Sequence, residues 1–157
     1  MMTRLTICCA VAMAAALAAS GAAAEECEGV SALKYAEPVI LKKADNGATT
    51  MLIRMTGSFT MTGTTGMTGD TFWQQCTGFW TVNADKSGSG AGSCFSMDGD
   101  GDQWVISWEG DNSGGTWANV SGTGKFAGWQ NSKGTWTYGA RYGDGLRLTL
   151  WKGTCGE

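Results

Sequence analysis

The chain has 157 residues, of which 11 are basic and 14 acidic, so its formal net charge is −3, and it contains no histidine. This mild acidity, without a cluster of basic residues, argues against a nucleic-acid-binding protein and against recruitment to anionic membrane surfaces. The lack of histidine excludes a Ser-His or Cys-His nucleophile and an imidazole base.

Residues 1–24 have the anatomy of a secretory signal peptide. Arg4 precedes an Ala-rich apolar run over residues 5–19, and small residues follow as a cleavage site. The run is shorter than the roughly 20 apolar residues that a membrane-spanning helix needs. A lipoprotein anchor at Cys8 or Cys9 is the alternative, and it is disfavoured because both cysteines lie inside the apolar run. We therefore expect an exported protein without a membrane anchor, either periplasmic or secreted.

Removal of that segment leaves residues 25–157, which are enough for one domain with its own core. Four cysteines remain, and an even number in an exported chain is typical of disulfides. Cys76 and Cys94 flank a turn-like stretch, so we expect them to face each other across a hairpin. Cys27 and Cys155 would then join the two ends of the domain. The alternatives are one bridge with two free thiols, or a metal site, which the absence of histidine and of a C-x-x-C pair disfavours.

Much of the domain consists of segments in which apolar and polar residues alternate, as in antiparallel strands with one dry face and one wet face. In chain order, the clearest segments are residues 50–61, 103–109, 135–142 and 146–150. The dry faces of the first three carry Met51, Ile53, Met55, Phe59 and Met61, then Trp104, Ile106 and Trp108, then Trp136, Tyr138, Ala140 and Tyr142. No long window shows helical spacing, so we predict an all-β domain.

The last alternating segment contains three leucines with polar residues between them. We expect its dry face, made of Leu146, Leu148 and Leu150, to point inward, and Arg147 and Thr149 to point to water. Arg54 and Arg141 fall on the wet faces of their own segments. Neither arginine is therefore expected to hold an anion in the interior.

Turn signals separate the segments. Asn46-Gly47 follows a short apolar run that begins after Pro38, and Gly143-Asp144-Gly145 precedes the last segment. Such spacing is typical of about eight strands. Because no helix covers the dry face, the sheet must enclose it by curling, and strand glycines such as Gly57, Gly78 and Gly139 permit that curvature. We predict a small antiparallel β-barrel of about eight strands, with a two-sheet sandwich as the alternative.

Residues 121–128 read Ser-Gly-Thr-Gly-Lys-Phe-Ala-Gly and are followed by Gly-Thr-Trp at 134–136. This segment resembles the Gly-Thr-Gly-x-Phe segment of dirigent proteins and allene oxide cyclase-like barrels. The resemblance implies an eight-stranded antiparallel barrel whose apolar cavity binds small hydrophobic molecules, which some members cyclise or couple. It is confined to this C-terminal segment and places no family catalytic residue. From the residues alone, the glycines allow a tight loop and Phe126 folds back as a plug under the sheet.

A second resemblance involves residues 115–119, which read Gly-Thr-Trp-Ala-Asn. They are similar to the opening strand of avidin-like biotin binders, which are also Trp-rich eight-stranded barrels. Here the segment lies in the C-terminal half, where that family does not have it. Five residues of a Trp-rich chain also match easily by chance, so this resemblance carries less weight.

The acidic segment around residue 100 is a candidate calcium-binding site. Asp98, Asp100 and Asp102, with Glu109 further on, mimic the carboxylate spacing of an EF-hand loop. Gln103 occupies the sixth place, where the sharp turn of such a loop requires glycine. The segment after it also alternates like a strand. We therefore prefer an acidic, solvated β-turn, and a looser calcium site at the three aspartates is the alternative.

Eight tryptophans in so short a chain are expected to form the core or the wall of a cavity. The aromatic residues expected inside, and proposed to contact a ligand, are Trp104, Trp108, Trp136, Tyr138 and Tyr142. The tryptophans that fit no clean alternation, and are candidates for the rim of an opening, are Trp73, Trp80, Trp117 and Trp129.

Three functions are compatible with these sequence features. The leading hypothesis is a module that binds a small, mainly apolar molecule in an aromatic cavity, without a cofactor. The second is a cofactor-independent isomerase, cyclase or lyase, for which the candidate catalytic residues are Glu109, Tyr138, Tyr142 and Asp102. The third is a structural barrel filled by its own side chains. A homo-oligomer is compatible with each of the three.

Overall fold

The computed structural model describes residues 24–63 and 66–156, and about two thirds of them lie in β-strands. The strands are β1 (Glu25–Tyr35), β2 (Val39–Lys43), β3 (Thr49–Met61), β4 (Thr71–Val82), β5 (Gly88–Met97), β6 (Gln103–Asp111), β7 (Gly114–Gly122), β8 (Lys133–Arg141) and β9 (Leu146–Cys155). Two 3₁₀ turns, η1 (Gly124–Phe126) and η2 (Gly143–Gly145), are the only helical elements in the part of the chain described. The expected signal peptide lies outside the described residues, apart from its last position.

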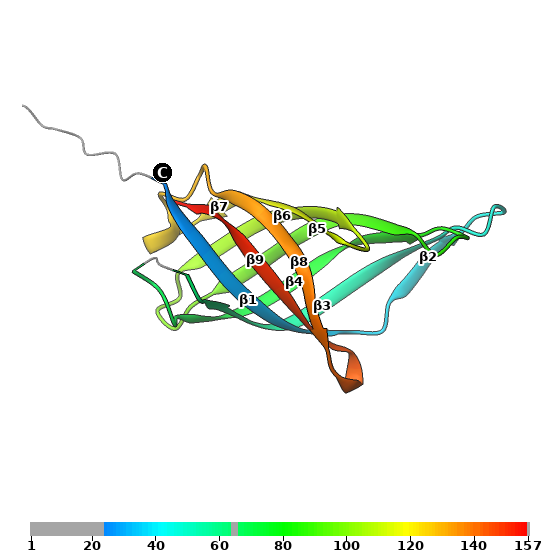
Figure 1. Ribbon diagram of the computed structural model, residues 1–157, viewed down its shortest axis with the longest axis horizontal. Helices are drawn as coiled ribbons and strands as arrows, with labels where there is room; N and C mark the ends of the chain where they lie inside the picture. Colours follow the sequence, from blue (N-terminus) through cyan, green and yellow to red (C-terminus); the bar gives the residue numbers. More distant parts are fainter. Residues whose placement is uncertain (1–23, 64–65, 157) are drawn as a thin grey trace, which may run out of the picture.

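The strands form one closed antiparallel barrel. Each strand from β3 to β8 pairs with the strand that follows it, β9 pairs with β1, and β1 pairs with β3 to close the sheet. Eight strands therefore make the barrel, and β2 is a ninth strand that pairs with β3 alone. Figure 1 shows β2 projecting from one end of the barrel, while the start of β1 and the end of β9 lie together at the other end. The barrel prediction is confirmed, and the sandwich alternative is wrong.

The inner face carries the alternating apolar residues of the sequence. On β3, Ile53, Met55, Phe59 and Met61 are buried, and on β6, Trp104, Ile106 and Trp108 are buried. Both sets match the dry faces predicted from alternation. Arg54 points outward and is exposed, as expected. No helix within the described ranges is both long enough and apolar enough to span a membrane.

The face assignment of the last strand was wrong. In β9 the inward positions are Arg147, Thr149 and Trp151, with Thr149 7% and Trp151 8% exposed, whereas Leu150 is 45% exposed. A one-residue change of register exchanges every side chain between the two faces, so the strand can place only one set inside. Trp151 and the disulfide-bonded Cys155 lie on the same face as Arg147. Burying the large indole and the disulfide outweighs burying the leucines.

The two disulfides pair the cysteines as expected. Cys27 is bonded to Cys155, which joins β1 to the end of β9 across a sequence separation of 128. Cys76 is bonded to Cys94 across the directly paired strands β4 and β5, with a separation of 18. All four cysteines are buried on the inner face. Two such bridges are typical of a protein that folds in an oxidising environment.

Glycine pairs on the inner wall make room for tryptophan rings. Gly78 and Gly92 face each other across β4 and β5, and Trp108 lies opposite Gly92 on β6. A Cβ atom on Gly78 would lie 2.5 Å from Trp108 Cζ2, and one on Gly92 would lie 2.7 Å from the same atom. The indole therefore packs directly on the bare backbone of two strands. Side chains at these two positions would force the ring toward the barrel axis.

Candidate functional site

The end of the barrel that holds the start of β1 and the end of β9 is filled with aromatic side chains, and we call it the filled half. Phe126 of η1 is 1% exposed and is the plug that the sequence predicted. Its ring centroid lies 5.6 Å from that of Phe72 and 5.0 Å from that of Trp129. Trp104 lies 5.0 Å from Trp129 and 5.7 Å from Phe59. The space left among the described side chains of this half is about 10 Å³, which is too small for a ligand.

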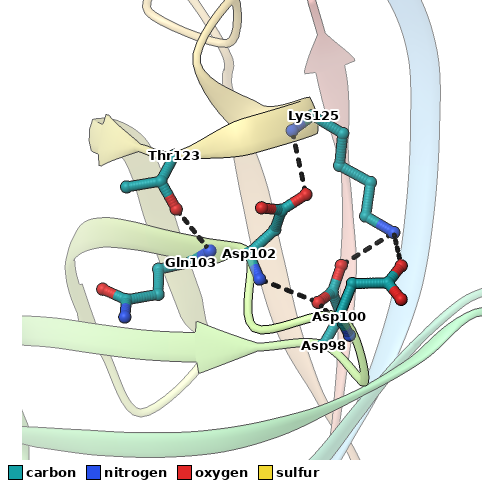
Figure 2. Close-up of polar contacts among 6 residues, drawn as sticks. All are labelled: Asp98, Asp100, Asp102, Gln103, Thr123 and Lys125. Atoms are coloured by element: carbon teal, nitrogen blue, oxygen red, sulfur yellow. Dashed lines mark hydrogen bonds and ion pairs between the residues drawn. The ribbon is translucent and has the colours of Figure 1, made fainter.

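The acidic turn at residues 98–102 is fastened to the loop that carries the plug (Figure 2). Lys125 Nζ lies 2.7 Å from Asp98 Oδ2, and the backbone N–H of Lys125 donates to Asp102 Oδ2 at 3.1 Å. Asp98 Oδ1 accepts hydrogen bonds from the backbone N–H groups of Asp100 and Asp102. Thr123 adds a third link, because its hydroxyl accepts the backbone N–H of Gln103 at 2.9 Å.

This turn therefore has its own cation. The Lys125 ammonium beside Asp98 lowers the pKa of that carboxyl, and the backbone donors act in the same direction. Within residues 24–63 and 66–156, no group of three acidic, cysteine or histidine side chains is arranged to hold a metal ion. The calcium alternative at Asp98, Asp100 and Asp102 gains no support, and the acidic turn is a clamp on the filled half.

The opposite end of the barrel contains a cavity of about 440 Å³ that is open to solvent, and we call it the open half. Its apolar wall consists mainly of methionine, aliphatic and aromatic side chains together with the Cys76–Cys94 disulfide. The residues that line it are Leu33, Tyr35, Ala36, Pro38, Met51, Ile53, Met55, Cys76, Trp80, Cys94, Trp108, Asn112, Trp136, Tyr138, Arg147, Thr149 and Trp151. Arg147 is the only charged residue among them. Ligand cavities in proteins are typically of this size and composition.

The indole N–H groups of the inner wall differ in whether they have a hydrogen-bond acceptor. Trp136 Nε1 donates to the carbonyl of Thr116 at 3.2 Å, and Trp151 Nε1 donates to the hydroxyl of Ser31 at 2.8 Å. In the filled half, Trp104 donates to Asn119 and Trp117 to the carbonyl of Lys152. Trp108 Nε1 is buried and has no hydrogen-bond partner among the described residues. It is an unsatisfied donor in a residue that lines the cavity.

Arg147 supplies a second unsatisfied donor in the same wall. Its Nε is buried without a hydrogen-bond partner in the part of the chain described. Its guanidinium carbon lies 3.9 Å from the centre of the Tyr138 ring, which is a cation–π contact. Burial raises the pKa of Tyr138 to about 12, the neighbouring Tyr35 adds to the rise, and Arg147 opposes it. Tyr138 is therefore a neutral phenol at physiological pH.

The aromatic residues proposed to contact a ligand are only partly gathered in the cavity. Trp108, Trp136 and Tyr138 line it, as expected. Trp104 belongs to the filled half. The interior placement of Tyr142 was wrong, because its side chain is 54% exposed. A β-bulge between Tyr138 and Arg141 changes the register, and β8 ends before Tyr142.

The tryptophans that were candidates for a rim lie in different parts of the barrel. Trp80 lines the open half, whereas Trp117 and Trp129 are 4% and 7% exposed, so a rim position is wrong for these two. Trp73 is 43% exposed on the outer face and packs against Phe95, with the ring centroids 5.9 Å apart.

The catalytic candidates are scattered. Glu109 is exposed and lies opposite Thr116 on the outer face. Asp102 belongs to the clamp at the filled half, and Tyr142 lies outside the barrel wall. Tyr138 alone lines the cavity. The four candidates therefore do not form one site.

Three cavity residues, Arg147, Thr149 and Trp151, were not predicted from the sequence. The leucine alternation in the same strand favoured the other face. Trp151 and Cys155 carried the missed signal, because both share the parity of Arg147, and a disulfide to Cys27 requires Cys155 to lie on the inner face. Extending the alternation from residue 150 to residue 155 would have indicated the correct face.

The chain matches no protein-family model, no curated protein and no solved structure. The resemblances to allene oxide cyclase-like barrels and to avidin-like barrels therefore stay predictions. The cavity and its lining residues are the features from which a function can be inferred.

Proposed function

We propose that the protein is an exported binding module whose open half holds one small, mainly apolar molecule. The observation that carries this proposal is the cavity of about 440 Å³, which lies in the same barrel as a filled half. The two disulfides support export, because such bridges persist mainly in oxidising compartments. The expected signal peptide would direct the chain there.

The unfilled volume itself is a reason to expect a ligand. Protein interiors pack as densely as organic crystals, and an apolar void lowers stability because its lining loses contacts. This chain has the means to fill a barrel, since Phe126 and Trp129 fill the other half from a loop. An apolar molecule in the open half would restore the missing contacts. A barrel filled solid by its own side chains does not account for the cavity.

An enzyme gains less support than a binding module. Of the four catalytic candidates only Tyr138 lines the cavity, and its raised pKa of about 12 makes it a poor base at neutral pH. It could donate a hydrogen bond, but Glu109 and Asp102 are not placed to assist it. Confinement in an apolar cavity remains the feature that the two hypotheses share.

The test uses N-phenyl-1-naphthylamine, a neutral apolar dye that accepts excitation energy from tryptophan. Titration of the oxidised protein should give saturable energy transfer, because Trp80, Trp108, Trp136 and Trp151 all line the cavity. Thr149 lines the cavity and is 7% exposed, whereas Thr137 lies on the neighbouring strand and does not line the cavity. Thr149→Phe should therefore weaken binding by about tenfold or more, and Thr137→Phe should leave it unchanged.

Circular dichroism and thermal melting establish that both variants keep the barrel. The absence of saturable binding to the native protein would refute the proposed function. Equal weakening by the two substitutions would show that the dye binds somewhere other than the open half.

A further inference from the structure

We infer that the molecule held in the open half is an organic anion, an apolar body with a carboxylate or similar group that Arg147 binds. The inference rests on the proposed function and specifies the class of ligand. It starts from the polar atoms that the cavity wall leaves without partners.

Some buried side-chain donors of the residues that line the cavity have no hydrogen-bond partner among the described residues. Three buried side-chain polar atoms of that part of the chain lack a hydrogen bond: Asp98 Oδ2, Trp108 Nε1 and Arg147 Nε. The first is paired with Lys125 at 2.7 Å, and neither residue lines the cavity. The other two belong to residues that line the cavity. Both atoms are donors shielded from solvent, so they add the positive end of an N–H dipole, and no acceptor, to this wall.

The charge of the cavity wall also favours an anionic ligand. Arg147 is the one charged lining residue, and no carboxylate of the described chain lines the cavity. Within the described ranges, the only ion pairs join Lys125 to Asp98 and Asp100, so Arg147 has no acidic partner there. A guanidinium held in an apolar wall attracts an anion strongly, because solvent screens the interaction poorly there.

A second arginine adds to the uncompensated positive charge at Arg147. Beyond the bulge in β8, Arg141 is the cross-strand partner of Arg147, and its side chain is exposed. Like charges directly opposite each other destabilise a sheet. No carboxylate in the described chain forms an ion pair with either arginine, although the protein as a whole is acidic. An anion bound between the cavity and the rim would compensate both charges.

Tyr138 is the positioning residue for this contact. The guanidinium lies over the Tyr138 ring, with its carbon 3.9 Å from the ring centre, and this contact holds the group at the wall. The N–H bonds of a guanidinium lie in one plane, so a group covered on one face by a ring keeps its edge for hydrogen bonds to a carboxylate. The apolar body of the ligand would then lie against the apolar lining residues, which include Met51, Trp108 and Trp136.

The test compares two dyes that share one ring system. N-phenyl-1-naphthylamine is neutral, and 8-anilino-1-naphthalenesulfonate carries one additional sulfonate. Arg147→Met should weaken binding of the sulfonate about 10- to 100-fold and change binding of the neutral dye by less than about twofold. Arg54→Met is the matched control, because Arg54 is exposed on the outer wall, and it should change neither affinity.

Two further measurements keep the inference falsifiable if Arg147→Met does not fold. Arg147→Lys keeps the charge but loses the planar fork, so it should weaken the sulfonate severalfold without affecting the neutral dye. With the native protein, decanoate and 1-naphthoate should displace the neutral dye at lower concentrations than decanol and 1-naphthalenemethanol. The alcohols are the more apolar members of each pair, so their weaker binding would indicate recognition of the anion.

The outcomes distinguish the anion inference from the proposed function. If the native protein binds the neutral dye but Arg147 substitutions weaken both dyes equally, or the alcohols bind more tightly, the anion inference is overturned and the apolar cavity stands. If neither dye binds, the proposed function itself fails.

Discussion

The two halves of this barrel are built from the same eight strands, yet one is packed solid and the other is hollow. In the filled half, the loop after β7 sends Phe126 and Trp129 into the barrel. In the open half the cavity is left between the strands, and Trp108 packs on the bare backbone of Gly78 and Gly92. Alternation along a strand therefore decides which face is dry. Loops and glycines decide whether the dry space is filled.

The polar groups of the two halves also differ, because those at the filled half are paired with one another and some in the open half are not. At the filled half, Asp98, Asp102 and Lys125 satisfy one another and close the end (Figure 2). In the open half, Arg147 and Trp108 retain donors without partners among the described residues. A finished network stabilises a fold, whereas an unfinished one in a cavity indicates a binding site.

The largest expected difference between the halves concerns their disulfides. Loop closure by Cys27–Cys155, with a separation of 128, should contribute about 5 kcal/mol, and closure by Cys76–Cys94, with a separation of 18, about 3 kcal/mol. Replacing each pair by alanines and measuring urea unfolding should show this order. A larger loss for Cys76–Cys94 would mean that the cavity wall, not the joined ends of β1 and β9, dominates stability.

A matched pair of methionines on β3 compares the packing of the two halves directly. Met61 is 2% exposed in the filled half, whereas Met51 lines the cavity. Met61→Ala should lower the free energy of unfolding by about 3 kcal/mol, because it leaves a void among packed neighbours. Met51→Ala should cost about 1 kcal/mol, since that side chain already borders empty space. Equal losses in chemical denaturation would show that both halves are filled.

The smallest effect is expected from Tyr138 at alkaline pH. Its pKa is raised to about 12, so between pH 10 and 12 the tyrosine ionises in the unfolded chain but not in the barrel. Stability that is complete below pH 10 is then lost as the pH rises, because the unfolded state releases its proton first. Solvent screening reduces the effect at this half-buried side chain, so we expect a loss of about 1 kcal/mol.

Tyr138→Phe should remove that part of the pH dependence in unfolding measurements at pH 9 to 12. Tyr142→Phe is the matched variant, because Tyr142 is 54% exposed, and it should keep the decline of the native protein. An unchanged decline in Tyr138→Phe would show that Tyr138 is not buried at the cavity.

Much of the fold followed from sequence because alternation and turn residues act locally. The strand of Met51 to Met61, the barrel, both disulfides and the Phe126 plug were all predicted. The inner face of β9 was not, because three leucines competed with Trp151 and Cys155 for the same space. The interior aromatic residues Trp108, Trp136 and Tyr138 were predicted, but Arg147 was missed with its strand. The cavity depends on which loops enter the barrel, and no local pattern encodes that.

The most direct test of the hollow half is a crystal structure of the oxidised protein soaked with 1-bromonaphthalene. We predict an anomalous bromine peak inside the barrel, within contact distance of Met51, Trp108 and Trp136, with the filled half unchanged. A barrel in which Trp80 and Trp108 occupy the space themselves, without a bromine peak between them, would contradict the existence of the cavity.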